Sequence, residues 1–292
     1  MGTTIHPTAV VDLSAELADG VVVEPYAVIG PLVRLGRGTR VRSFAHIVCR
    51  TAVGEGCDIH SGAVVGGDPQ DLKFKGEATD CVIGNRNTIR ECVTINRGTG
   101  VGGGKTIIGD NNLIMAYVHI AHDCVVGNGC LFTNGVQLAG HVNVEDFAWL
   151  SGSALVHHFV TVGTMAFIAG NSGVRADVPP YLIVDGDPPK PRKVNTEGMR
   201  RRGVPAASID AVKSAFRRIY RTKGTRADAV AELMSAPEGA DPYVRTLLEH
   251  YRASERGFQG RALERFRTDR GATVALPRGM VPQNGVGDAP MQ

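Results

Sequence analysis

The chain has 292 residues, enough for one large domain or for a domain with a smaller companion. Aromatic residues make up only 5% of it and glycine contributes 37 residues, a composition that fits helix bundles and doubly wound sheets but also thin, repetitive β structures with no room for large rings. A net charge of +3 argues against binding of polyanions by the chain as a whole, so we expect no nucleic acid partner.

The sequence also lacks the usual marks of export or membrane insertion. Its first residues show no basic stretch followed by an apolar run, so we expect no signal peptide. No run of about 18 apolar residues occurs, and we expect no integral membrane segment. The six cysteines form no C-x-x-C pair and no metal-ligand spacing, which indicates a reducing, cytoplasmic location.

A six-residue repeat of apolar residues runs through the first two thirds of the chain. It comprises Ile5, Val11, Leu17, Val23, Ile29, Leu35, Val41, Ile47, Val53, Ile59, Val65, Ile83, Ile89, Ile95, Ile108, Ile114, Ile120, Val126, Phe132, Leu138, Val144, Leu150, Val156, Val162, Ile168 and Val174. The phase breaks twice, over residues 66–82 and 97–105. Glycine, asparagine or aspartate commonly follows the apolar position, as tight turns require.

This period fits neither an α-helix nor one long strand. It predicts a coil of three short parallel strands with 18 residues per turn, in which residues 18 apart stack in columns at the interstrand spacing of about 4.8 Å. The two breaks then become loops that leave the coil, where functional residues often lie. A purely structural solenoid would need nothing beyond this repeat.

The pattern changes after Val174. Prolines between residues 177 and 192 are expected to end the strand ladder, and helical stripes follow at 208–222, 225–234 and 241–254. We therefore predict a β-solenoid at 1–190, a helical domain at 191–258 and a mostly disordered tail at 259–292, which is rich in Arg, Gly and Pro.

Histidines gather on one edge of the predicted coil. Steps of 18 residues place His122, Gly140 and His158 in one column, with the other members of the group beside it. The group consists of Asn96, His119, His122, His141, His157 and His158. Five of the nine histidines on one edge are hard to explain as solvated surface residues, so we predict a functional site there.

Two kinds of chemistry suit such a group. Histidine is the commonest ligand of transition metals, and some hexapeptide-repeat carbonic anhydrases hold zinc in this way. Alternatively, an imidazole acts as a general base beside a backbone N–H that stabilises an oxyanion. Asp123, which follows His122, and the bare Gly140 one coil above favour base catalysis and no bound metal.

The same residues resemble a known family. The strings QDLKF (70–74), HIAHDC (119–124), LAGHV (138–142), VHHF (156–159), DVPPY (177–181) and VNTEGMRRRG (194–203) are similar to the UDP-N-acetylglucosamine acyltransferases of lipid A synthesis. The resemblance spans most of residues 4–258. It implies a left-handed parallel β-helix with a C-terminal helical domain, assembled as a homotrimer, and it implies no cofactor.

The resemblance also implies an activity. A 3-hydroxyacyl chain would pass from acyl carrier protein to the 3-hydroxyl of a UDP-sugar, UDP-N-acetylglucosamine. His122 would be the general base, Asp123 the acid beside it and the Gly140 N–H the oxyanion donor. The implied substrate-binding residues are Asp71, Lys73, His119, His141 and His157, with Asn195, Glu197, Arg201 and Arg202 at the nucleotide and Gly170 as a ruler for acyl length.

Two positions depart from the family pattern. Asn96 stands where a histidine is usual, and His158 stands where a glutamine is usual. These changes leave open an N-acyl transfer to a 2,3-diamino sugar nucleotide. A zinc-dependent hydratase of the carbonic anhydrase kind and a scaffold without activity are the further alternatives.

Basic residues are concentrated in one stretch. Residues 190–223 contain eleven Lys and Arg (190, 192, 193, 200, 201, 202, 213, 217, 218, 221 and 223) and only two acids, Glu197 and Asp210. A solvated helix face would explain this equally well for an arbitrary protein. Because acyl carrier proteins are strongly acidic, the stretch suggests docking of that partner beside the active site.

Overall fold

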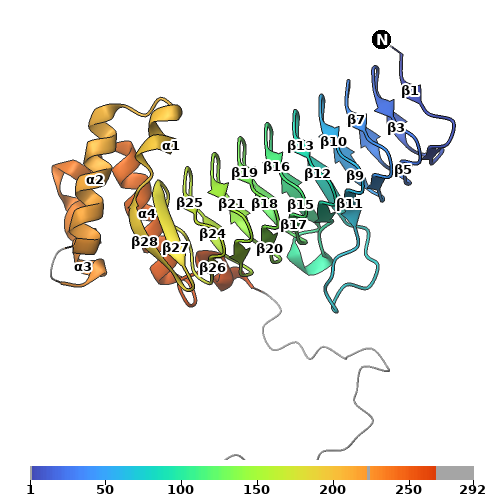
Figure 1. Ribbon diagram of the computed structural model, residues 1–292. Coiled ribbons are helices and arrows are strands. Elements are labelled where there is room, and N and C mark those ends of the chain that lie inside the picture. Colours follow the sequence, from blue (N-terminus) through green and yellow to red (C-terminus); the bar gives the residue numbers. More distant parts are fainter. Residues whose placement is uncertain (1, 222–223, 268–292) are drawn as a thin grey trace, which may run out of the picture.

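The computed structural model describes residues 2–221 and 224–267. The chain winds into a long coil with three parallel faces, and helices cover its C-terminal end (Figure 1). Sheet A contains β1 Thr4–Ile5, β4 Val22–Val23, β7 Arg40–Val41, β10 Asp58–Ile59, β13 Thr88–Ile89, β16 Leu113–Ile114, β19 Leu131–Phe132, β22 Trp149–Leu150, β25 Phe167–Ile168, β27 Leu182–Gly186 and β28 Pro189–Val194.

The other two faces are shorter. Sheet B contains β2 Val10–Val11, β5 Val28–Ile29, β8 His46–Ile47, β11 Val64–Gly67, β14 Thr94–Asn96, β17 His119–Ile120, β20 Gln137–Leu138, β23 Leu155–Val156 and β26 Gly173–Val174. Sheet C contains β3 Glu16–Leu17, β6 Arg34–Leu35, β9 Thr51–Val53, β12 Asp80–Ile83, β15 Lys105–Ile108, β18 Val125–Val126, β21 Asn143–Val144 and β24 Thr161–Val162. This is a parallel β-helix, as predicted.

The pairing register is the predicted one. Ile120 pairs with Leu138 and Leu138 with Val156, in steps of 18 residues. Each of the 26 predicted apolar positions lies in one of the strands β1–β26. Beyond the first coil these side chains are buried in one continuous core, because neighbouring coils cover them above and below.

Both inserted loops leave the coil at the same corner, which we call the B–C corner because its turns lead from sheet B to sheet C. The first loop runs over residues 68–79 between β11 and β12, and the second over residues 97–104 between β14 and β15, with a 3₁₀ turn η1 at Gly100–Gly102. They project side by side from the middle of the solenoid (Figure 1). The turns of the C–A and A–B corners are defined in the same way.

The C-terminal helices are α1 Thr196–Arg201, α2 Ala206–Arg221, α3 Arg226–Ser235 and α4 Pro242–Arg256, with 3₁₀ turns η2 Pro237–Ala240 and η3 Ala262–Phe266. Their apolar faces form a second core that also includes Met165, Tyr181 and Leu182 from the end of the solenoid. The division of the chain at residue 190 stays a prediction. None of the helices in the described part of the chain has the length and hydrophobicity that a bilayer crossing requires.

Two expectations need correction. The prolines do not end the strand ladder at once, since Phe167 in β25 pairs in parallel with Ile183 in β27 and only then does β28 turn back antiparallel. Pro189 and Pro191 lie in β28, the edge strand of sheet A, which is the place in a sheet where proline is tolerated. Residues 259–267 are folded rather than disordered, and 268–292 lie outside the described residues. Helix α1 was not predicted.

A polar ladder runs inside the C–A corner. Asn112, which is 2% exposed, accepts a hydrogen bond from the Cys130 N–H (2.7 Å) and donates one to the Gly127 carbonyl (3.0 Å). Its own N–H donates to the side chain of Asn87 (2.9 Å), which repeats the pattern one coil below. Each amide therefore satisfies turn groups that water cannot reach.

We expect Asn112→Ala to lower the free energy of unfolding by about 2–4 kcal/mol, because it leaves a buried N–H and a buried carbonyl without partners. Chemical denaturation measures the loss. The exposed Asn134→Ala serves as the control and should stay close to wild type. Equal stability of the two variants would contradict a structural role for the ladder.

Candidate active site

The centre of the site is a histidine–aspartate pair at the B–C corner. His122 follows β17 in the turn toward β18, and its Nδ1 lies 2.8 Å from Oδ2 of Asp123. Because a carboxylate only accepts hydrogen bonds, Nδ1 carries the proton and donates it. The unprotonated Nε2 is then the ring nitrogen that can take up a proton from a substrate.

The second inserted loop holds Asp123 in place. The Thr99 Oγ1 hydroxyl donates to Asp123 Oδ2 at 2.6 Å, and the Thr99 N–H donates to Oδ1 at 3.0 Å. The Asp123 side chain is completely buried, and its backbone N–H donates to Thr106. A buried carboxylate held by these donors keeps its orientation, so it can fix the tautomer of His122 and stabilise the imidazolium.

Gly140 lies one coil above His122, as the column arithmetic predicts. A Cβ at this position would come within 2.5 Å of Cε1 and 2.7 Å of Nε2 of the imidazole, so only glycine fits without displacing the ring. Within residues 2–221 and 224–267, the Gly140 N–H donates no hydrogen bond. A backbone donor beside a base is the arrangement that acyl transfer requires for a developing oxyanion.

Three residues of left-handed backbone stack above one another next to this pair. Asp123, His141 and Phe159 follow at intervals of one coil, with φ of 59°, 62° and 62°. The His141 ring stacks on Phe159 at 4.4 Å between centroids and meets His122 edge-on at 5.2 Å. His141 Nε2 lies 3.9 Å from Asp123 Oδ2, so the imidazole belongs to the same cluster.

His119 lies on the sheet B side of the pair. Its Nδ1 is 2.7 Å from the Thr94 hydroxyl one coil below. Burial lowers the pKa of His119 below its usual value, and the neighbouring His122 lowers it further. The ring is therefore neutral near pH 7, where it can donate or accept a hydrogen bond but adds no positive charge to the site.

The first inserted loop folds over His122. Asp71 Oδ2 lies 3.8 Å from His122 Nε2 and 2.9 Å from the Lys73 ammonium. Burial would raise the pKa of the Asp71 carboxyl, but hydrogen bonds from the Lys73 backbone and side chain outweigh it and hold the pKa below its usual value. The loop thus brings one negative and one positive group to the open side of the base.

These residues border a groove of about 440 Å³ on sheet B. Its lining comprises Gln70, His119, Ala121, His122, Gln137, Leu138, Ala139, Gly140, Leu155, Val156, His157, Gly173, Val174, Arg175 and Asp187. Polar groups lie at both ends of the groove, His119 and His122 at one and Arg175 and Asp187 at the other, and aliphatic side chains such as Leu155 lie between them. Such a surface suits a polar reacting centre with an apolar tail.

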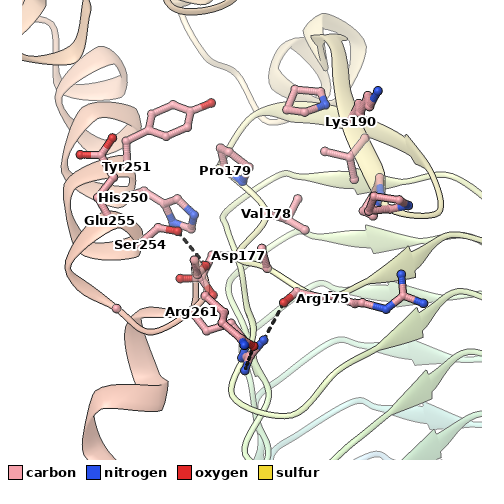
Figure 2. Close-up of a pocket in the computed structure, with 18 of the residues that line it drawn as sticks. Arg175, Asp177, Val178, Pro179, Lys190, His250, Tyr251, Ser254, Glu255 and Arg261 are labelled. Carbon is pink, nitrogen blue, oxygen red and sulfur yellow. Dashed lines mark hydrogen bonds between the residues drawn. The ribbon is translucent and has the colours of Figure 1, made fainter. Parts of the chain in front are cut away.

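A larger cleft adjoins this groove. It encloses about 710 Å³ between α4 and the β27–β28 hairpin, and it shares His157 and Arg175 with the groove. Figure 2 shows His250 and Tyr251 of α4 facing Asp177 and Pro179 across it. Burial lowers the pKa of His250 to about 4, so this imidazole is uncharged at neutral pH.

Several predicted residues take other positions. Asn96 is buried, and its side-chain amide donates to the Asp68 carbonyl at 2.8 Å, which anchors the first loop rather than facing the groove. His158 also lies off the groove, packed on His157 and Phe159. Burial and the neighbouring His157 lower the pKa of His158 to about 4.

The predicted nucleotide residues and Gly170 lie at other corners. Asn195 caps α1 and donates to the Met165 carbonyl at the C–A corner, while the Arg202 guanidinium covers Phe147 there. Glu197 and Arg201 pair on the exposed face of α1 at 2.8 Å. Gly170 lies in the exposed A–B turn between β25 and β26. Within one chain, none of these residues borders the His122 groove.

Metal binding has one candidate group in the described part of the chain. Ligand atoms of His122, Asp123 and His141 lie within 4.8 Å of one another. The Asp123 carboxylate, however, already accepts bonds from His122 and from both donors of Thr99. A metal ion would have to displace them, so the donor set fits base catalysis better than a metal centre.

Sequence reasoning missed Thr94 and Thr99, which orient His119 and Asp123. Thr94 could have been found, because it lies one coil below His119 in the paired register. Thr99 lies in an inserted loop where the period is interrupted, and nothing in the repeat indicates that it returns to the corner.

Comparisons with known proteins identify the family that this chain resembles. The family described as "Udp N-acetylglucosamine O-acyltransferase; Domain 2" matches residues 177–259, and "Bacterial transferase hexapeptide (six repeats)" matches residues 105–140. An acyl-[acyl-carrier-protein]–UDP-N-acetylglucosamine O-acyltransferase of Stenotrophomonas maltophilia (strain R551-3) is 45% identical over 253 residues, covering 86% of this chain and 96% of the relative.

Solved structures give the same result. The UDP-N-acetylglucosamine acyltransferase of Francisella novicida superposes with a TM-score of 0.81 at 38% identity, covering 84% of this chain and 90% of its own. The enzyme of Bacteroides fragilis superposes with a TM-score of 0.82 at 37% identity, covering 85% and 97%. The chain therefore belongs to the UDP-N-acetylglucosamine O-acyltransferase family.

Proposed function

We propose that this protein transfers a 3-hydroxyacyl chain from acyl carrier protein to the 3-hydroxyl of UDP-N-acetylglucosamine, the first step of lipid A synthesis. The observation that carries the proposal is the His122–Asp123 pair beneath the N–H of Gly140, in a chain of this family. The relative from S. maltophilia bears the name of this reaction.

The reaction follows from the geometry. His122 Nε2 removes the proton of the sugar hydroxyl as the oxygen attacks the thioester carbonyl carbon. The Gly140 N–H stabilises the negative charge that develops on the carbonyl oxygen. The C–S bond then breaks, and the thiolate leaves with the proton from the imidazolium, whose charge Asp123 has balanced. An ester and a free thiol result, and His122 returns to its neutral form.

A direct transfer needs no acyl-enzyme. Cys124 is the cysteine beside the catalytic pair, but its thiol is buried in the core, and burial raises its pKa to about 12. The reactive thiolate is therefore not populated at neutral pH. Transfer in a single displacement agrees with the absence of a hydrolase-type nucleophile motif from the sequence.

We infer that the active form is a cytoplasmic homotrimer. Asn195 and Arg202, the predicted nucleotide residues, lie at the C–A corner of the chain, whereas His122 lies at the B–C corner. One substrate can contact both sets if two chains pack corner to corner. All six cysteines are free, in keeping with a reducing compartment.

An ester product remains our choice over an amide. Asn96 and His158, the two departures that suggested an amino-sugar acceptor, do not line the groove of their own chain. Asn96 holds the first loop, and His158 packs on aromatic rings. The base, the oxyanion donor and the Asp71–Lys73 loop carry none of these changes.

We expect His122→Ala to lower kcat by roughly 10²–10⁴-fold, because the base is lost while the oxyanion donor stays. Steady-state transfer from an acyl carrier protein thioester to UDP-N-acetylglucosamine measures the effect, with product mass identifying the ester. His6→Ala, at an exposed histidine of the first coil, is the matched control and should be as active as wild type.

The same assay distinguishes acyl transfer from the zinc-dependent hydratase alternative. Transfer should survive prolonged dialysis against a chelator, because no step uses a metal. Near-normal turnover of His122→Ala would refute the mechanism. Loss of activity to chelators with about one zinc per chain would support the metal-dependent reading.

We propose that Gly170 limits the acyl chain, as the family resemblance implies. A Cβ at Gly170 would lie 3.2 Å from the Gly152 carbonyl and otherwise point into open space, so a long side chain there projects outward. We expect Gly170→Met to shift the preferred donor toward shorter chains, measured with a series of acyl carrier protein thioesters. An unchanged profile would show that the acyl end lies elsewhere.

We propose that the basic stretch of α2 docks the acidic carrier. Arg217 and Arg221 are exposed, whereas Arg218 is half-buried and pairs with Glu232 of α3 at 3.3 Å. The double variant Arg217→Glu with Arg221→Glu should raise KM for the carrier severalfold and leave KM for the sugar nucleotide unchanged. Raising salt from about 50 to 500 mM should act in the same direction on wild type, because it screens exposed charges.

A matched control carries the same charge change at a distant site. Arg34→Glu with Arg37→Glu reverses two exposed arginines near the N-terminal end of the solenoid. If both double variants raised KM for the carrier equally, net charge rather than a docking surface would explain the effect. A normal KM for the α2 variant would move the docking site to the solenoid.

A further inference from the structure

The described chain continues beyond the part that matches the family. The C-terminal family match ends at residue 259, whereas the structure describes residues up to Arg267. We call residues 260–267 the C-terminal extension. It begins at Gly260. Arg261 forms an isolated antiparallel bridge with Phe258, and the 3₁₀ turn η3 follows.

The extension is firmly attached to the solenoid. Asp177 stands one coil after Phe159; its N–H donates to the Gly260 carbonyl (2.8 Å), and its Oδ2 accepts from the Ala262 N–H (2.8 Å). Arg261 donates to the Arg175 carbonyl at 2.9 Å, a contact drawn in Figure 2. Nine-tenths or more of the Arg261 side chain is buried, as is that of Glu264, which it meets at 3.2 Å. Removing one partner of such a pair is costly, so the segment stays in place.

From this anchor the extension reaches the catalytic corner. Leu263, Phe266 and Arg267 form one wall of a hollow of about 220 Å³. The opposite wall comprises Val101, Gly102, Asp123, Val125, His141, Val142, Asn143 and Phe159. The extension therefore closes the sheet C side of the His122–Asp123 pair, whereas the substrate groove lies on the sheet B side.

A continuous series of contacts leads from Arg267 to the base. The Arg267 guanidinium carbon lies 5.6 Å from the ring centroid of Phe159, a cation–π contact. Phe159 stacks on His141 with the planes 5° apart, and His141 meets His122 edge-on. Charges of the extension also reach the neighbouring imidazole, since Glu264 raises and Arg267 lowers the pKa of His158.

We propose that the C-terminal extension is a positioning element of the acyl-transfer site, in which Arg267 holds Phe159 against His141 and so keeps the imidazole packed on the catalytic pair. The inference rests on the proposed function. Phe159 and His141 project from turns of left-handed backbone into the hollow that the extension closes, so their stacking depends on what covers them. Displacement of a catalytic group by a fraction of an ångström costs rate without weakening substrate binding.

The test uses three variants of the full-length protein. We expect Arg267→Ala to lower kcat about tenfold with both KM values within about twofold of wild type. Arg267→Lys, which keeps a cation over the ring, should recover most of the rate. Arg265→Ala removes the same charge two residues earlier, from η3 itself, but Arg265 covers Phe266 instead of Phe159, so it should behave as wild type.

A double-mutant cycle tests the route through Phe159. In a Phe159→Leu background, Arg267→Ala should have no further effect on kcat, because the ring that it acts on is gone. A full tenfold loss in that background would overturn the proposed route. Equal kcat for Arg267→Ala and Arg265→Ala would overturn the positioning role itself.

A failure of this proposal can be distinguished from a failure of the proposed function. If wild type transferred no acyl chain, the function would fail before any variant was compared. Thermal melting would reveal whether Arg267→Ala lowers activity only because the protein unfolds. In that case Arg267→Gln replaces Arg267→Ala in the double-mutant cycle with Phe159→Leu, and that cycle tests the positioning role. An active, folded Arg267→Gln enzyme with normal kcat would overturn the proposal.

Discussion

Parallel pairing between residues one coil apart is the constraint on which the whole molecule depends. Because the strands of each sheet keep a fixed register, such as Ile120 with Leu138 and Leu138 with Val156, each strand residue of the inner coils has a neighbour of defined type above and below it. The same rule builds the apolar core, the amide ladder of the C–A corner and the His122–Gly140 contact. The candidate active site is thus built on the outside of the coil by the same stacking of successive coils that stabilises the interior.

The register also explains what the sequence could predict. The period of six placed all 26 solenoid strands and put Gly140 over His122, since both follow from counting. It could not place Thr99, because an inserted loop returns to the corner through contacts that no period encodes. Helix α1 is six residues long and gives too short a stripe to detect. The fold of residues 260–267 depends on Asp177 and Arg175, far away in the chain.

At the B–C corner, the regular coil and the segments outside the repeat supply different groups. The solenoid supplies His122, Asp123 and Gly140 from regular turns, whose backbone is fixed by hydrogen bonds to adjacent coils. The loops supply Asp71, Lys73 and Thr99, and the extension supplies Arg267. The proposed base and oxyanion donor therefore come from the repeat, while segments outside it supply groups that orient them or that lie at the open side of the base.

The buried amides of the C–A corner have a consequence for folding. A chain built from near-identical hexads has many almost equivalent threadings, because a slip by one whole coil keeps every aliphatic residue facing inward. Asn87 and Asn112 occur in two successive coils only, and their partners belong to particular neighbouring turns. A slipped threading would separate Asn112 from Asn87, which accepts its N–H, and would set each amide beside another residue of the column. The ladder therefore distinguishes the middle coils from the others and favours one threading of the chain, which the hydrophobic pattern alone does not do.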